Sequence, residues 1–519
     1  MSPSPSSLPL EAPPAPPATS GVLPRQTRTS RQRLAVALGL GVLAQGLLDR
    51  PLWGVSFPLV VAALVAALAL LGGREALRRA RPNAWLLVPL GVVSCFVAVR
   101  ASPWLTTLNV LTAAVLVLML SHFWSSGRVE RLGLWGYPAV VLSTVGRGLL
   151  LPFSMTREAV DLRAAGRLMP RVLPFVRGLL IVVPVLGVFA VLLTSADVAF
   201  GAAMGRLLAM DLDVLLANAV SWAFGTLLFS AASAAFLGHA LRRRAVWAAP
   251  ELGEQEVAPA APRLGLTEAL MLVLAVDVLF GVFAGFQVTY LFVGDATSPA
   301  SGYTYAQYAR RGFFELMLVS LLTLGLVMAL ARWSRRESPL ARRVFQVGTS
   351  LMVGLTLVIV ASAVKRMTLY EDAYGYTRLR LFTHVFMVAL GVVLAWRCVT
   401  LWWRPERFAV GAFVTALASV LTVNVIDPDA LIVRLNLARD TSEEALDVPY
   451  LVGWLSEDAV PELVKAGDDP RLGEGFQRGL YDRFLRDGDT PTWPEWNLGR
   501  WRARRALEAV PERFSAGGS

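Results

Sequence analysis

A succession of long apolar runs constrains the fold of this chain more than any other feature. Most runs approach or exceed the ~20 residues that a helix needs to cross a bilayer. They lie at 34–48, 51–72, 84–99, 103–121, 178–198, 213–240, 265–294, 312–333, 343–364, 379–402 and 406–426. Backbone polar groups in lipid must be bonded internally, so continuous apolar runs of this length are helices. We therefore predict an all-α fold, with a polytopic transmembrane helix bundle of about eleven crossings over residues 34–426.

The positions of the arginines predict which way this bundle faces. Arginines cluster before Leu34 and near 74–81, 128–131, 157–171, 242–244, 332–343 and 404–407. Cytoplasmic loops carry an excess of Lys and Arg. All these clusters fall on one side if the apolar stretch 132–153 does not cross, so we interpret 132–173 as an interfacial or re-entrant cytoplasmic segment. The N-terminus is then cytoplasmic and the C-terminus extracytoplasmic.

Three segments outside the apolar runs differ in composition. Residues 1–33 are rich in Pro, Ser and Ala and then basic, which predicts disorder. Residues 245–263 resemble a Pro/Ala/Glu-rich cytoplasmic linker. Residues 427–519 are mixed in charge and carry helix signals, including Ser456 before two acidic residues and an amphipathic pattern over 493–510. We expect 427–519 to form a small α-helical extracytoplasmic domain.

The stretch 286–316 concentrates polar and aromatic residues beside a membrane surface, where packing against lipid needs none of them. A Thr304–Gln307 capping box predicts a helix start, and Arg311 and Glu315 are spaced to pair along that helix. The simplest interpretation is an aromatic belt with one local ion pair. The other is a binding surface, with Gln287, Tyr290, Tyr303, Tyr305, Tyr308, Arg310, Arg311 and Glu315 as its candidate residues.

Two further outer segments repeat this composition. Arg378 and Arg380 lie on the predicted outer side, where the positive-inside rule leads us to expect few arginines. Carboxylates of the same loop, such as Glu371, or an anionic ligand should therefore pair with them. In 424–439, Asp427 and Asp429 are placed to cap the helix that follows. Together the three segments predict a composite pocket roofed by the C-terminal domain. It adds as candidates Tyr370, Tyr374, Arg378, Arg380, Asp427, Asn436 and Arg439.

Asp277 is an acidic residue near the middle of an apolar run. Gly281 and Gly285 follow at i+4 and i+8, which places it on a face that packs closely on another helix. An intramembrane carboxylate is a functional candidate by default. The alternative is a structural hydrogen bond between helices, with Asn218 or Ser221 of the preceding apolar run as partner.

Other chemistries find little support in the sequence. Cys95 and Cys398 lie in separate apolar runs, and the histidines (His122, His239 and His384) each stand alone on a different segment, so we predict no metal site and no cofactor. No basic stretch carries interleaved aromatics, so we expect no nucleic-acid partner. No catalytic constellation can be assembled, which favours a non-enzymatic protein without deciding the question.

Several stretches carry a resemblance to a family. They are DRPLWGVSFPL at 49–59, RGLLIVVPVLGVFAVLLTSAD at 177–197, FQVTYLFVG at 286–294, YTYAQYARRGFFEL at 303–316, YGYTRLR at 374–380, NVIDPDALIVRLNLAR at 424–439 and LDVPYLVGWLSEDAVPEL at 446–463. The chain resembles bacterial multi-spanning membrane proteins of domain-of-unknown-function family 4173, related to family 4153. Tyr376 stands where that family leads us to expect a smaller or aliphatic residue. The resemblance implies a bacterial inner-membrane protein and offers no activity or substrate.

Three functions follow from these observations. The first is an outward-facing binding or regulatory protein that recognises an anionic lipid or an envelope component; its partners are then membrane lipids and that component. The second is a transporter or channel with Asp277 on its path. The third is a membrane-embedded transferase, which fits poorly because the first outer loop, about Asp49–Arg50, is too short to hold catalytic carboxylates.

Overall fold

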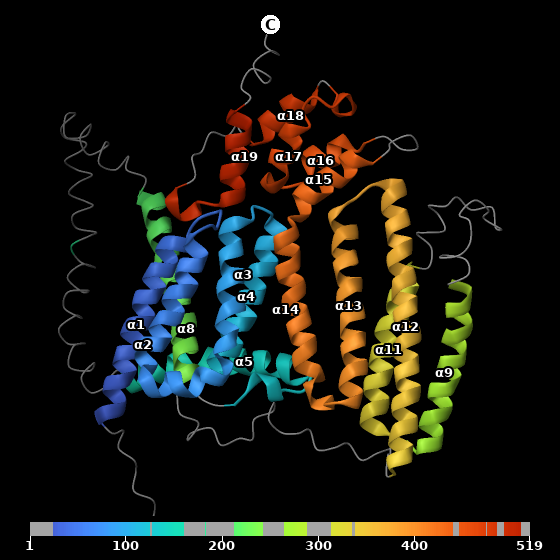
Figure 1. Cartoon of the computed structure of the whole chain (residues 1–519). Helices are drawn as coiled ribbons and strands as arrows, with labels where there is room; N and C mark the ends of the chain where they lie inside the picture. Colours follow the sequence, from blue (N-terminus) through green and yellow to red (C-terminus); the bar gives the residue numbers. More distant parts are fainter. Residues whose placement is uncertain are drawn as a thin grey trace, which may run out of the picture.

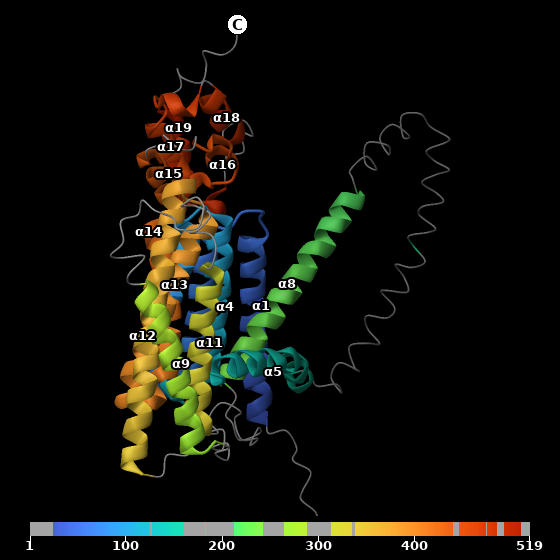
Figure 2. The ribbon, with the colours of Figure 1, turned by 90° about the vertical axis from the view of Figure 1, so that its right-hand side faces the viewer.

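The computed structural model describes residues 24–124, 127–159, 212–241, 264–287, 313–334, 338–439, 446–473, 475–484 and 492–509, together with Val182. The described residues form helices and their connections, and the one β-bridge among them is isolated (Leu264 with Ser334). Long helices run side by side in a bundle, and a layer of short helices covers one end of it (Figures 1 and 2). The predicted all-α fold is confirmed for this part of the chain.

Within the described part of the chain, eight helical segments are long and apolar enough to cross a membrane. They are Ser56–Val99, Pro103–Phe123 (α4), Ala217–Leu241 within α8 (Leu212–Leu241), Leu266–Gln287 (α9), Phe313–Trp333 (α11), Pro339–Tyr374 (α12), Arg378–Trp402 (α13) and Pro405–Ile426, which holds α14 (Phe408–Ile426). Ser56–Val99 comprises α2 (Ser56–Ala80), a 3-10 turn η1 (Arg81–Leu86) and α3 (Leu87–Val99), with the chain reversing between α2 and α3 (Figure 1). These eight segments indicate a membrane protein. The expected run 178–198 lies outside the described residues, apart from Val182.

The helices pack through two apolar regions. One joins α1 (Pro24–Leu48) to α2–α5, α8 and α14, with Leu68, Leu86 and Leu116 fully buried. The other joins α9, α11, α12 and α13 around buried Phe345 and Met352. Large apolar side chains on the outward faces, such as those of α9, are exposed, as expected of helices that face lipid.

Helix α1 begins at Pro24, before the first apolar run. Residues 24–33 are therefore helical, and the prediction of disorder over 1–33 is wrong for this part; residues 1–23 lie outside the described chain. Arg, Gln and Leu in 24–34 have high helix propensity, which explains why the helix extends into the basic segment.

Helix α5 (Gly136–Ala159) lies across the lower ends of the upright helices rather than beside them (Figures 1 and 2). It contains Pro152 and is not one of the eight candidate spans. This orientation is the one expected of the interfacial segment predicted from 132–153. The predicted linker 245–263 lies outside the described residues.

The C-terminal layer, defined here as the helices of residues 428–509, covers the opposite end of the bundle from α5 (Figure 1). Its helices bury their own apolar cluster, in which Ile432, Val433 and Leu455 are fully buried. Ser456 caps a short helix as predicted, since its hydroxyl accepts from Asp458 N at 3.4 Å. The helices are α15 (Pro428–Ala438), α16 (Val448–Gly453), η6 (Glu457–Ala459), α17 (Val460–Lys465), η7 (Pro470–Leu472), α18 (Gly475–Phe484), η8 (Trp493–Glu495) and α19 (Leu498–Glu508).

Candidate functional site

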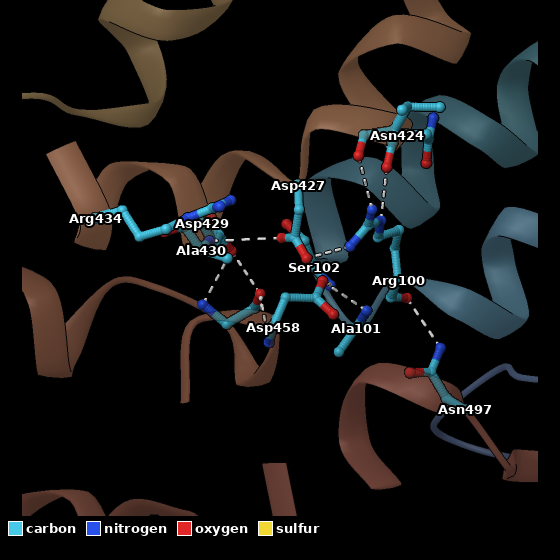
Figure 3. A network of polar contacts seen from close by, with 12 residues as sticks. Arg100, Ala101, Ser102, Asn424, Asp427, Asp429, Ala430, Arg434, Asp458 and Asn497 are labelled. Atoms are coloured by element: carbon cyan, nitrogen blue, oxygen red, sulfur yellow. Dashed lines mark hydrogen bonds and ion pairs between the residues drawn. The ribbon is translucent and has the colours of Figure 1, made fainter. Parts of the chain in front are cut away.

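A network of polar side chains joins the C-terminal layer to the upper end of the bundle (Figure 3). Arg100 follows α3; its Nε donates to Asn424 O at 2.7 Å and its guanidinium pairs with the Asp427 carboxylate. The last carbonyls of a helix have no donor within the helix, and a cation there also suits the helix dipole. Arg100 therefore closes the end of α14 and holds the turn from which the layer begins.

That turn depends on Asp427. Its φ of 55° is left-handed, which no other described non-glycine residue shows, and aspartate tolerates this conformation better than most residues. Its side chain accepts from Ala430 N at 3.5 Å and so caps α15, as predicted. One turn below it, the side-chain amides of Asn109 and Asn424 exchange hydrogen bonds of 2.8 and 2.7 Å. The end of α14 is thus tied to both α3 and α4.

Asn497 connects α19 to the end of α3. Its Nδ2 donates to Val97 O and to Arg100 O, both at 2.9 Å, which satisfies two carbonyls that α3 leaves without donors. Its Oδ1 accepts from Arg500 N at 3.2 Å and caps α19. Because Asn497 is buried, one side chain ends a helix of the bundle and begins a helix of the layer.

Asp458 makes the matching connection to the start of α4. Its Oδ2 accepts from Ala101 N at 2.8 Å and from Ser102 N at 3.1 Å, just before the helix begins. Burial raises the pKa of Asp458 to about 7, and the nearby Asp427 carboxylate adds to this, while Arg100 and the two backbone donors oppose it. A carboxyl group that ionises near neutral pH therefore lies between layer and bundle.

A cavity of about 240 Å³ opens beside this carboxyl group. Its lining combines three carboxylates with two cations, and Lys465 Nζ lies 3.0 Å from Glu462 Oε1. The space can hold several waters or one small polar molecule. The lining residues are Asp427, Ala430, Asp458, Pro461, Glu462, Lys465, Gly499 and Arg502.

Beside the cavity, Arg378 forms a bidentate pair with Asp429. Its Nε donates to Oδ1 at 2.6 Å and its second nitrogen contacts Oδ2. The same Oδ2 accepts from Ser456 N at 3.0 Å. Asp429 therefore does not cap α15 but joins α13, α15 and the layer. The sequence predicted a carboxylate of the same loop or an anionic ligand as the partner of Arg378, whereas the partner is a carboxylate of the next outer segment.

The other arginines of these segments also have internal partners. Arg380 donates to Tyr374 O at 3.0 Å and stacks over the Tyr370 ring at 4.3 Å. Arg439 donates to Ala373 O at 2.8 Å. These arginines hold the 370–380 turn in place, so they do not form an open site for an anion.

Asn436 pairs with the backbone of the same turn. It accepts from Tyr376 N at 2.8 Å and donates to Tyr376 O at 2.9 Å. The two outer segments 370–380 and 424–439 therefore meet, as the composite pocket required. The Tyr376 ring packs against the apolar cluster of the layer.

Comparison with known families matches residues 87–466 to a domain of unknown function, DUF4153. The match covers well over half of the chain. The chain belongs to the DUF4153 family. No curated protein and no solved structure matches it. Arg100, Asp427 and Asp458 lie inside the DUF4153 match and Asn497 lies beyond it; membership in the related family 4173 remains a prediction.

Part of the predicted site lies outside the residues described for this DUF4153 chain: Tyr290, Tyr303, Tyr305, Tyr308, Arg310 and Arg311. Glu315 is exposed on α11, and its expected pairing with Arg311 therefore stays a prediction. Gln287 is buried at the end of α9 and accepts from Ser362 Oγ at 2.7 Å and from Arg366 at 3.2 Å. It contributes to a second polar cluster, away from the cavity.

Asp277 and Asn218 are not brought together. Asp277 is buried on α9, where Gly348 of α12 faces it, and its Oδ1 has no hydrogen-bond partner among the described residues. Asn218 is exposed on α8, which packs mainly on α1 and α5 and leans away from the other helices (Figure 2). The predicted hydrogen bond to Asn218 or Ser221 is wrong because neighbours along the chain are not neighbours in the bundle.

Sequence reasoning missed two groups in this DUF4153 chain. It did not single out Arg100, Asp458 or Asn497, although Arg100 was another arginine on the outer side of the predicted topology. It also treated the histidines as isolated, whereas His122 Nδ1 and His239 Nε2 lie 3.5 Å apart. His384, in turn, lies 3.1 Å from Glu371. Such pairings depend on helix packing, which the chain order does not reveal.

Proposed function

We propose that this protein is an integral protein of a bacterial cytoplasmic membrane whose C-terminal layer lies on the extracytoplasmic face as a binding or regulatory domain. The arginine distribution supports this orientation, because all the arginine clusters fall on one side when α5 is counted as interfacial. About eleven crossings result when α2 and α3 are counted separately, α1 is added, and 178–198 also crosses. A periplasm-specific reporter fused after Ser519 tests the orientation; activity of a cytoplasmic reporter there would contradict it.

The cavity of the C-terminal layer, beside the turn at Asp427, is the observation that supports a binding role. Its carboxylates (Asp427, Asp458 and Glu462) offer acceptors, and Lys465 and Arg502 offer donors. Asp458 is buried, and the more exposed side chains of Glu462, Lys465 and Arg502 converge on the same small space. Polar groups that converge on a concave space are typical of a ligand site. Among the described arginines that were expected to recognise an anion, Arg378 pairs with Asp429, and Arg380 and Arg439 donate to backbone carbonyls. Arg310 and Arg311 lie outside the described residues.

This chemistry favours a ligand that carries several hydroxyl or amino groups over an anionic lipid. Hydroxyl and ammonium groups donate hydrogen bonds to carboxylates, whereas a phosphate would be repelled by the three carboxylates that line the cavity. We therefore propose that the layer recognises a sugar-like or amine-bearing envelope component, and that occupation of the cavity regulates how tightly the layer docks on the bundle.

The test is ligand-dependent stabilisation of the full chain in nanodiscs, with glucosamine and glycerol as probes. A ligand at ~100 times its Kd raises the free energy of unfolding by about 2.7 kcal/mol. Glu462→Gln should abolish the effect, whereas Asp469→Asn should preserve it, since Asp469 pairs with Arg471 at η7 and does not line the cavity. No stabilisation by either probe, or equal stabilisation of the wild type and the Glu462→Gln variant, would contradict the proposed ligand class.

A transport function is the second candidate, and buried charged residues on helices α9 and α12 support it. Asp277, Arg366 and Glu371 are all buried on α9 and α12, and one carboxylate oxygen of each acid has no hydrogen-bond partner among the described residues. Intramembrane ionisable residues of this kind mark ion or proton paths. Asp277→Asn should abolish solute-driven proton flux in proteoliposomes, while Asp372→Asn, at an exposed position, should leave it unchanged.

A further inference from the structure

A group of exposed aromatic and basic side chains lies where the C-terminal layer meets the bundle, apart from the cavity. Trp493, Trp496 and Trp501 expose 65%, 43% and 44% of their surface. Tryptophan is usually well buried in folded proteins, so three exposed rings within nine residues need an explanation. We call the group the tryptophan rim; it comprises Trp493, Trp496, Trp501, Leu52, Arg50 and Arg505, all exposed.

The rim lies at the level where helices leave the apolar part of the bundle. Helix α1 ends at Leu48 and α2 begins at Ser56, and the connection between them touches η8 and α19. Val55 N donates to Trp496 O and Arg500 donates to Trp53 O, both at 2.9 Å. A Cβ at Gly54 would lie 2.2 Å from Trp496 O, so only glycine permits this approach. The exposed rings are thus held beside the ends of two long apolar helices.

The charge of the rim is positive. Helix α19 contains four arginines and one glutamate. Arg505 lies over the Trp501 ring at 5.2 Å. The nearest acid of η8, Glu495, turns inward, where it accepts from Thr492 N at 3.0 Å and from Thr492 Oγ1 at 2.6 Å. The exposed face therefore combines indole rings with guanidinium groups.

We propose that the tryptophan rim binds the headgroups of anionic phospholipids in the leaflet around this end of the bundle. Tryptophan is enriched at membrane–water interfaces, where its ring sits among headgroups and its N–H reaches water. Guanidinium groups bind phosphate through paired hydrogen bonds. Positive charge at the level of the helix ends favours this leaflet over a partner protein. The rim thereby anchors α19 on the bilayer, independently of any ligand in the cavity.

Amide hydrogen exchange of the full chain in nanodiscs tests this proposal. Exchange of residues 493–505 should be slower in bilayers that contain phosphatidylglycerol than in phosphatidylcholine alone. A basic residue near an anionic surface contributes about 1 kcal/mol, which corresponds to roughly a fivefold effect. Arg505→Gln and Arg50→Gln should each reduce the difference between the two bilayers by about this factor, and Trp493→Ser should also reduce it.

Matched variants use exposed residues of the same layer outside the rim. Arg434→Gln on α15 and Trp454→Ser beside α16 remove the same chemical groups and should retain the wild-type difference. Equal exchange in the two bilayers would overturn the proposal even if a rim variant fails to fold, because that comparison uses the wild-type chain. Equal protection in lipid-free micelles would also overturn it, since the protection would then not depend on phospholipid headgroups.

Discussion

Replacing Asp458 by asparagine should remove a pH dependence from the docking of the C-terminal layer. The carboxyl group accepts from Ala101 N and Ser102 N, and its pKa lies near 7 rather than 3.8 because it is buried beside Asp427. Asparagine keeps a carbonyl oxygen for the two donors and resembles the protonated acid, but it cannot ionise. At acidic pH, the C-terminal layer of the variant should therefore dock as tightly as that of the wild type. At alkaline pH, it should dock more tightly than that of the wild type.

The sign and size of the effect follow from linkage. In the folded chain Asp458 holds its proton more tightly than in the unfolded chain, so its contribution to stability is fully present below pH 3.8 and is lost as the pH rises through about 7. The whole contribution is roughly 4 kcal/mol at about 1.4 kcal/mol per pH unit. Between pH 5 and pH 8, about 2.7 kcal/mol of it disappears, which corresponds to about a hundredfold change in the population of the undocked state.

Amide exchange at Ala101 and Ser102 measures the population of the undocked state directly, once the exchange rates are corrected for the intrinsic effect of pH. Wild-type protection should fall about a hundredfold from pH 5 to pH 8, and protection in Asp458→Asn should stay constant. Asp469→Asn is the control: hydrogen bonds from Arg471 lower the pKa of Asp469, so its contribution is lost only below pH 3.8. The reasoning is refuted if wild-type protection is equal at both pH values or if the asparagine variant follows the wild type.

Three further changes test other parts of the structure. Asn497→Ala leaves two buried carbonyls without donors and removes the cap of α19, so the free energy of unfolding should fall by about 3 kcal/mol or more; an unchanged midpoint in thermal denaturation would contradict the capping role. Gly375→Ala should cost about 1–3 kcal/mol, because φ is 82° and a Cβ would lie 2.5 Å from an Arg439 nitrogen; Gly354→Ala, with open space around it, should be tolerated, and equal effects of the two would exclude the steric argument. Asp429→Asn should release Arg378 and increase proteolysis of the layer; the bidentate pair is unimportant if the cleavage rate does not change.

The amino-acid sequence alone was enough to predict the helices and to indicate a membrane protein. Long apolar runs leave a chain in lipid no structure other than helices, since every backbone polar group must find its partner within the run. Arginine clusters singled out 132–153, and α5 does lie across the ends of the other helices. Local signals also located the caps at Asp427 and Ser456, because a cap depends only on residues a few positions apart.

Which polar residues meet depends on the packing of the helices. Asp458 and Asn497 are ordinary polar residues in the sequence, and they become part of a site only because the layer folds onto the turn at 100–102. Asp277 lacked its expected partner for the same reason, since α8 lies against α1 rather than α9. Helix formation is dictated by neighbours along the chain, whereas the site depends on contacts between residues more than 300 positions apart, such as Arg100 with Asp427, and these are set by packing.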